Sequence, residues 1–399
     1  MLERWEENYE FQTNDYHALL SEVEEMVRNT CWHHDLDSSA LKLTAIEDPM
    51  SVQTISKDKK LDYDQTYANF QDGSKLIVEY DEDRFANISS IARGTLCETA
   101  KLSGSSLGRM SGWKLAQTLN NGLEVARGKT LLLLRYNAAM AFHSDGSYAI
   151  MPMNELLDIT RENLEARFGT AQFKSGTHAN SYTTATFTLP DAQKSIMNRY
   201  QQSLTEAVTN RHPINFMPAA RFSSSDTAHS CAILKPMFLM PNGTAFSMGD
   251  GIAVKHEQKA RRALNGIDAY REETKELYSK FEATMENIQR LSKIEIQHPT
   301  NCYVGICNYL NRSQQMIPRR YADDGLADVE YYEYASPVLS AHDLYLSLVS
   351  CIHAAQVAGA SRGTIFFIEE AIAKVIAPSF DWKRFDVGGT VVWGEKNGW

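Results

Sequence analysis

The segment FSSSDTAHSC, residues 222–231, places four serines, a carboxylate, an imidazole and a thiol close together. Serine, histidine and aspartate are the groups that act as nucleophile, base and orienting acid in hydrolases. A nucleophilic serine, however, sits on a strained turn flanked by glycine, and this segment contains no glycine. In an extended strand Asp226 and His229 would point to opposite faces, because they are three residues apart. We therefore interpret Ser225, Asp226 and His229 as parts of a polar turn.

A hydrolase remains a third hypothesis for this chain, behind two binding functions given below. It would use His229 together with Asp226 or His256. Serine and aspartate favour turns because their side chains bond nearby backbone groups, which supports the structural interpretation instead.

A second segment, VKHEQKARR, gathers positive charge where a predicted strand meets a long helix. Its four cations are Lys255, Lys259, Arg261 and Arg262. On a helix the first, second and fourth of these would share a face and could follow a phosphate backbone. The alternative is an ordinary solvated helix face. Three aromatic residues nearby would stack on bases if exposed, although such strand positions are usually core: Phe222, Phe238 and Phe246.

Other patterns of chemically active residues are incomplete. The run CWHHD, residues 31–35, holds four candidate metal ligands, but no second half of a zinc pattern follows. His256 and Glu257 begin a sequence that lacks the second histidine of a zinc protease, and no phosphate-binding glycine loop occurs. We predict no metal and no cofactor. We interpret the adjacent carboxylates Asp323 and Asp324 as part of a solvated loop. We interpret Glu369 and Glu370 as part of an exposed helix face.

The composition is that of a folded protein of more than one structural unit. The chain has 399 residues, of which 43% are hydrophobic and 23% charged. Its formal charge of -10 argues against a nucleic-acid coat over the whole surface and leaves only a local basic patch open. The six scattered cysteines suit a reducing compartment. We find neither a signal segment nor the roughly 20 apolar residues of a membrane span, and expect a cytoplasmic protein.

Hydrophobic periodicity predicts an α+β fold with an antiparallel, curved sheet, packed helices and a helical C-terminal third. Residues 182–188 alternate as a half-buried strand does, and apolar residues spaced along 277–291 form one stripe of a long helix. Asp145 and Gly146 predict the turn of a hairpin within 129–152. We expect three units: an irregular lobe over 1–105, a sheet core over 106–260 and a helical region over 261–399.

Three short elements between residues 220 and 260 resemble a family of phage- and plasmid-encoded proteins labelled "phage/plasmid-like protein". The matching residues are, in turn, Ser225, Asp226 and Ser230, then Asn242 and Gly243, then Lys255 and His256. The family's turn glycine and the cysteine before its Asn-Gly pair are replaced here. The resemblance implies origin in a mobile genetic element and a bacterial host cytoplasm, and it implies no particular reaction.

These observations lead to two main functional hypotheses. The first is a non-enzymatic accessory protein that binds single-stranded nucleic acid through the curved sheet and the basic segment. The second is an inhibitor that binds a host or defence protein, suggested by the acidic, tyrosine-rich run at 321–337. Self-association is a further expectation. The first hypothesis predicts binding that weakens steeply with salt.

Overall fold

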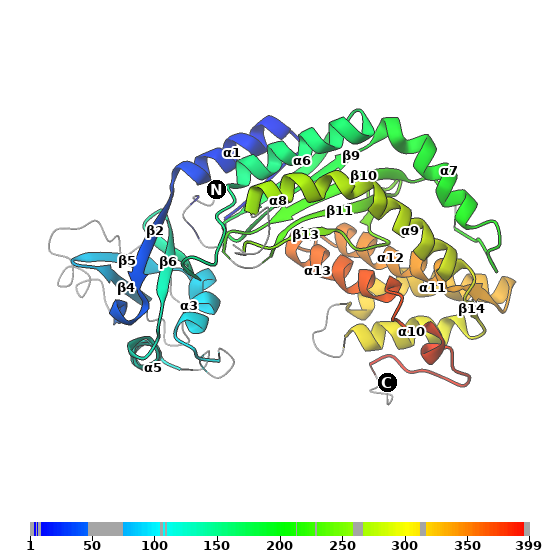
Figure 1. Ribbon diagram of the computed structural model, residues 1–399. Helices are drawn as coiled ribbons and strands as arrows, with labels where there is room; N and C mark the ends of the chain where they lie inside the picture. Colours follow the sequence, from blue (N-terminus) through cyan, green and yellow to red (C-terminus); the bar gives the residue numbers. More distant parts are fainter. Residues whose placement is uncertain are drawn as a thin grey trace.

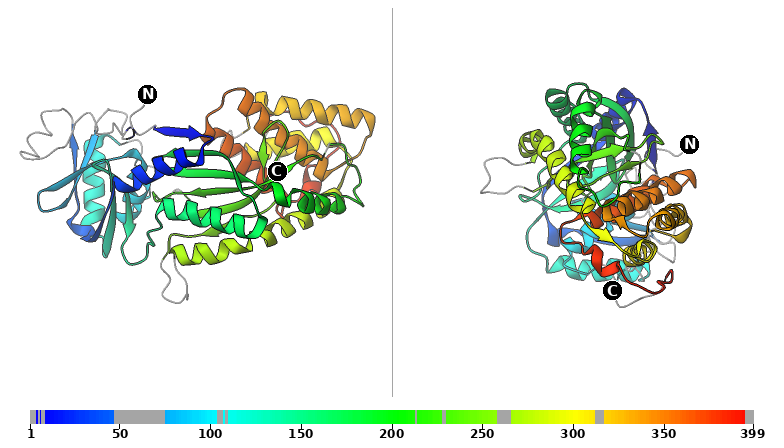
Figure 2. Two further views of the ribbon diagram at one scale, coloured as in Figure 1. Left: turned by 90° about the horizontal axis from the view of Figure 1, so that it is seen from above. Right: turned by 90° about the vertical axis from the view of Figure 1, so that its right-hand side faces the viewer.

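The computed structural model of the protein contains two sheets and a helical region (Figure 1). It describes residues 9–46, 75–103, 110–212, 214–227, 230–257, 266–311 and 317–394, with the single residues 4, 6 and 107. The fold is α+β, with a curled antiparallel sheet and a helical C-terminal third, as the sequence predicts. The N-terminal lobe and the C-terminal helices lie at opposite ends of the molecule when it is seen from above (Figure 2).

The central sheet is antiparallel throughout. Its strands are β1 (Glu10–Thr13), β8 (Gln172–Ala179), β9 (Tyr182–Thr188), β10 (Met217–Ser224), β11 (Ala232–Leu239) and β12 (Ala245–Phe246), with β13 (Ile252–Val254) also paired to β11. Successive side chains alternate between the two faces. In β9, Ala185 and Phe187 are fully buried on one face, while Thr184 and Thr186 belong to the other.

Helices cover the apolar face of this sheet (Figure 1). They are α1 (Tyr16–Arg28), α6 (Met153–Phe168), α7 (Gln193–Ser203), α8 (Gly266–Glu273) and α9 (Leu277–Ser292). The predicted stripe of the long helix is confirmed, because Leu277, Phe281, Ile288 and Leu291 of α9 are buried in the main core.

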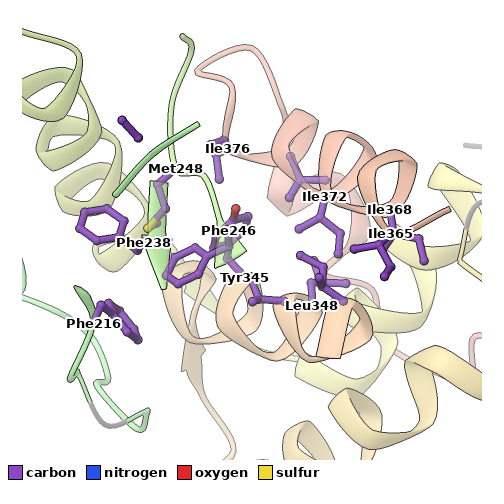
Figure 3. Packing of buried hydrophobic residues seen from close by; sticks show 14 of the residues in the cluster. Phe216, Phe238, Phe246, Met248, Tyr345, Leu348, Ile365, Ile368, Ile372 and Ile376 are labelled. Carbon is purple, nitrogen blue, oxygen red and sulfur yellow. The ribbon is translucent and has the colours of Figure 1, made fainter. Parts of the chain in front are cut away.

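The remaining helices form a layer at the C-terminal end. They are α10 (Pro299–Leu310), α11 (Arg319–Ala335), α12 (Ala341–Val357) and α13 (Arg362–Ala373), with a short ribbon of β14 (Glu295–Ile296) and β15 (Leu339–Ser340). Figure 3 shows aromatic residues of the sheet region, among them Phe238 and Phe246, close to Tyr345 of α12. Helix α13 lies beside α12 and under the second face of the sheet (Figure 1).

The N-terminal lobe has its own sheet and its own core. Its strands are β2 (Thr30–Asp37), β3 (Lys42–Ile46), β4 (Lys75–Asp81), β5 (Arg84–Ile88), β6 (Lys129–Arg135) and β7 (Ala138–Ser144), packed with α3 (Arg93–Thr99) and α5 (Gly112–Glu124). The order is β2-β6-β7-β5-β4-β3, and β5 pairs with β7 in parallel. The sheets therefore divide the chain differently from the three expected ranges: β1 and α1 belong to the central unit, and 112–144 belongs to the lobe.

The hairpin predicted around Asp145 and Gly146 has its turn elsewhere. Strands β6 and β7 pair with each other, and the chain reverses at Tyr136 and Asn137, which both have positive φ. Two successive positive φ values match the right-handed twist of the strands, so this is the favoured turn geometry although neither residue is glycine. The prediction was wrong because Asp145 and Gly146 form the turn that follows β7.

Candidate functional site

The bend after β10 connects the two lobes through Asp226. The guanidinium of Arg135, whose side chain is fully buried, lies 2.5 Å from a carboxylate oxygen of Asp226. The same guanidinium donates to the carbonyl of Asn180 at 2.9 Å and to the hydroxyl of Thr30 at 3.1 Å. Its three donor nitrogens are thereby engaged, so a buried cation is paired and hydrogen-bonded on every side. We call Arg135, Asp226, His143, Tyr148 and His256 the junction cluster.

Backbone and ring contacts complete the junction cluster. The carbonyl of Asp226 accepts bonds from His143 Nε2 at 2.9 Å and from the Tyr148 hydroxyl at 3.1 Å. The Tyr148 oxygen lies 3.2 Å from His256 Nδ1, and His256 Nε2 lies 3.3 Å from the Ser224 hydroxyl. Because Tyr148 gives its proton to the carbonyl, Nδ1 of His256 carries the ring proton and Nε2 accepts from Ser224.

The chemistry of the junction cluster is that of a closed structural joint. Burial lowers the pKa of His143 to about 4, and burial also lowers the pKa of His256. Ser224 is completely buried, and the carboxylate of Asp226 pairs with Arg135. Next to them, the backbone N–H of Thr227 donates to the Ser225 hydroxyl at 3.2 Å, as in a polar turn.

The remaining residues singled out from the sequence lie apart from this cluster or outside the described residues. Asn242 and Gly243 form the turn between β11 and β12, where Gly243 has a φ of 84°. Lys255 follows β13 and is not in a helix, contrary to the prediction, and it lies 3.4 Å from Glu257. Residues outside the described part of the chain are His229, Lys259, Arg261 and Arg262.

A groove of about 480 Å³ opens between the second face of the central sheet and α13. Its floor is made by alternate residues of three neighbouring strands. They are Ser175 and Thr177 of β8, Tyr182, Thr184 and Thr186 of β9, and Arg221 and Ser223 of β10. The opposite wall is α13, which contributes Arg362, Phe366, Phe367 and Glu369. Because side chains alternate along a strand, a single face of the sheet supplies this polar floor.

Several hydroxyl groups of the groove floor have no partner within the part of the chain that the structure describes. No side-chain hydrogen bond is made there by Ser175, Thr177, Thr184 or Ser223, although Thr177 and Ser223 are buried residues. None of these hydroxyl oxygens is among the fully buried side-chain atoms that lack a partner in the described chain, so they face the open groove. These four hydroxyls are therefore available to a ligand in the groove.

Two ion pairs join α13 to the sheet beside the groove. Arg221 donates through two nitrogens to both carboxylate oxygens of Glu369, and Lys235 lies 2.5 Å from Glu370. The exposed helix face predicted for the two glutamates was wrong for Glu369, which is buried. The reason is a partner far away in the sequence, Arg221. Burial raises the pKa of Glu369 in spite of the neighbouring cation.

Aromatic side chains are present at the groove, but not those named from the sequence. Phe222, Phe238 and Phe246 are buried in the core, whereas Phe367 of α13 is 58% exposed at the groove wall. Part of the signal for the floor was present in the sequence: hydroxyl residues recur at every second position in β8 and β9, whereas β10 contributes only Ser223, two residues after Arg221. The sequence did not indicate that α13 forms the opposite wall of the groove, because the periodicity of a helix does not tell which strands the helix faces.

No family model, curated protein or solved structure matches this chain. The resemblance of residues 220–260 to phage and plasmid proteins stays a prediction. Within the described ranges, no helix has both the length and the apolarity needed to cross a membrane. Fold and site define an α+β protein with a closed polar junction between two lobes and an open, hydroxyl-lined groove.

Proposed function

We propose that the protein binds single-stranded nucleic acid in the groove between the central sheet and α13, without catalysing a reaction. The observation that carries this proposal is the floor of unpaired hydroxyls facing an exposed aromatic residue, Phe367. A cavity of about 480 Å³ suits a ligand of nucleotide size. Aromatic rings bind single strands by stacking on bases, and this contact tolerates any sequence because every base has a π face.

Polar groups of the groove are placed for the strand's backbone. Hydroxyls such as Thr184 and Ser223 donate to phosphate and sugar oxygens, and such contacts fix the position of a strand. Arg362 at the rim supplies an exposed cation, which donates a hydrogen bond to the Gln12 side chain at 3.4 Å. Lys255 follows β13, which pairs with β11 next to Ser230 of the groove, so the basic segment starts at this edge of the sheet.

The test is binding of a fluorescent oligothymidylate, measured by anisotropy. Replacing Phe367 by Ala should weaken binding about 5- to 150-fold, since stacking contributes about 1–3 kcal/mol per base. The matched control is Tyr334→Ala on α11, because Tyr334 is 95% exposed and lies outside the groove lining. Absence of binding even at low salt, or equal losses in both variants, would contradict the proposal.

Charge supplies a second test of the same proposal. Each phosphate neutralised on a single strand contributes about -0.7 to the slope of log affinity against log salt. Arg362→Ala should therefore make the slope shallower by about 0.7. The control Arg319→Ala removes an exposed cation that pairs with Asp323 on α11, and it should leave the slope unchanged.

On this proposal the chain is an accessory protein of a phage or plasmid and works in a bacterial cytoplasm. That origin is supported only by the resemblance of residues 220–260.

A second candidate function is protein binding through α11. Tyr331 and Tyr334 are 70% and 95% exposed there, beside the exposed carboxylates Asp324 and Glu330. Exposed tyrosines flanked by acidic groups suit a partner with a basic surface. A purified basic partner protein from the host should lose affinity for the Tyr331→Ala variant and not for Phe367→Ala; the reverse order would remove this candidate.

A further inference from the structure

Two cations lie side by side next to the groove: Arg221 lines the groove itself, and Lys235 lines the smaller cavity beside it. In the strand register Arg221 of β10 is directly opposite Thr186 of β9 on one side and Lys235 of β11 on the other. Like charges at directly opposite positions destabilise a sheet. Such a pair is suited to an anion, because arginine and lysine make their strongest hydrogen bonds to phosphate and carboxylate groups.

In the free protein two glutamates of α13 supply that anion. Glu369 accepts both bonds from Arg221, and Glu370 pairs with Lys235. Arg221 and Glu369 line the groove and also a smaller cavity of about 40 Å³ next to it. Their side chains are only 17% and 7% exposed, so the pair is reached from the groove and not from the outer surface.

We propose that Arg221 and Lys235 form a phosphate subsite where the groove borders the smaller cavity, and that Glu369 and Glu370 occupy this subsite until a strand binds. This inference rests on the proposed function and specifies how the strand's backbone is recognised. An oxygen of a phosphodiester group replaces the Glu369 carboxylate on Arg221. The released carboxylate then takes one proton from the buffer, and no covalent bond of the strand changes.

The surroundings of Glu369 favour its protonated form once Arg221 is engaged elsewhere. The charged and titratable groups that act on it come from each element packed against it: Arg221 of β10, Lys235 of β11, Glu370 of α13 and Tyr345 of α12. Burial raises the pKa of Glu369, and Arg221 is the strongest influence that lowers it. Removal of that cation must raise this pKa further, because a buried carboxylate without a partner is disfavoured.

Helix α13 can lose these ion pairs without leaving its place. The helix also carries Ile365, Ile368 and Ile372, which are buried in the main core and lie near Leu348 of α12 (Figure 3). Burying an aliphatic side chain of this size contributes about 1.5–3 kcal/mol, so the helix is held mainly by apolar packing. The exchange of anions then needs only a rotation of the glutamate side chains.

The experiment is titration calorimetry of the full chain with oligothymidylate in two buffers of different ionisation enthalpy. At neutral pH we expect uptake of about one proton per strand bound, and affinity that rises up to about tenfold for each unit by which pH falls toward the Glu369 pKa. Glu369→Gln should abolish the proton uptake and bind more tightly at neutral pH. Glu282→Gln, in an exposed pair with Arg199, should change neither quantity.

Each outcome has one meaning. Binding without proton uptake and without pH dependence overturns the subsite while leaving the proposed function standing, whereas no binding by the wild-type chain at any pH overturns the proposed function itself. The wild-type measurement suffices if Glu369→Gln does not fold. Titration with sulfate distinguishes a free inorganic anion from a nucleic-acid strand, because sulfate does not titrate in this range. Proton uptake on binding sulfate, without proton uptake on binding the strand, would show that a strand is not the ligand of this subsite.

Discussion

The junction cluster and the groove both contain an arginine bonded to a carboxylate, yet they differ in what surrounds the pair. All three donor nitrogens have partners in both arginines, but the Arg135 side chain is fully buried whereas the Arg221 side chain is 17% exposed. Around Arg221 the pair borders a cavity whose neighbouring hydroxyls, such as Ser223, have no partner among the described residues. A cluster whose polar groups all have partners stabilises a fold, whereas hydroxyls without partners beside a cavity are available to a ligand.

The largest expected effect comes from breaking the pair at the junction. Asp226→Ala leaves the Arg135 cation buried and uncompensated, and such a loss costs about 3–5 kcal/mol in free energy of unfolding. Urea denaturation measures it. The control Glu282→Ala removes an exposed pair with Arg199 and should cost at most about 1 kcal/mol. Equal losses would show that Arg135 is not buried as described.

The second-largest expected effect is an opposite response of the two regions to acid. The folded pKa of His143 is about 4, against an ordinary value of 6.5, so the unfolded chain binds the proton first. The contribution of His143 to the free energy of unfolding is therefore fully present above pH 6.5. It is lost as the pH falls toward 4, and the loss is about 3 kcal/mol. Glu369, with its raised pKa, has the opposite sign and favours the folded state as it becomes protonated.

The measurement is the free energy of unfolding as a function of pH. The variant His143→Gln removes the titrating group and retains a side-chain donor for the Asp226 carbonyl, so its stability should depend less on pH. An unchanged pH dependence in this variant would assign the acid sensitivity to other groups, such as His178, whose pKa burial lowers to about 3.

The smallest effect compares two hydroxyls. Thr227 at the junction bonds to the Ser225 hydroxyl at 2.9 Å and to the Ser181 carbonyl at 3.3 Å. Thr227→Val should therefore lower the free energy of unfolding by about 1 kcal/mol. Thr184→Val in the groove loses no hydrogen bond within the described chain and should leave stability unchanged while weakening binding of the strand. A stability loss at Thr184 equal to that at Thr227 would remove the distinction between the two regions.

Local patterns in the sequence predicted much of the secondary structure. The alternation over 182–188 and the apolar stripe of 277–291 each report a neighbour that lies within a few residues, so they could be found without a structure. The turn at Tyr136 and Asn137 escaped prediction because two non-glycine residues take positive φ there. The fold class followed from such patterns because strand and helix periods differ.

The candidate groove could not be predicted to the same degree. Arg221 and Glu369 come from segments far apart in the chain, and no local pattern tells that they meet. The hydroxyl residues of the floor could have been recognised by their period of two, but the wall opposite them could not. The adjacent polar residues Ser225 and Asp226 belong instead to the bend that joins the lobes.

The course of the chain through the central sheet has a consequence during synthesis. Strand β1 pairs with β8, Glu10 opposite Ala179, and the whole N-terminal lobe lies between them in the sequence. Since segments emerge from the ribosome in order, the lobe can fold around its own core while β1 is still unpaired, because β8 has not yet been synthesised. A nascent chain stalled at that stage would display a finished lobe beside an unpaired strand edge, the state in which chaperone contact and misassociation are most expected.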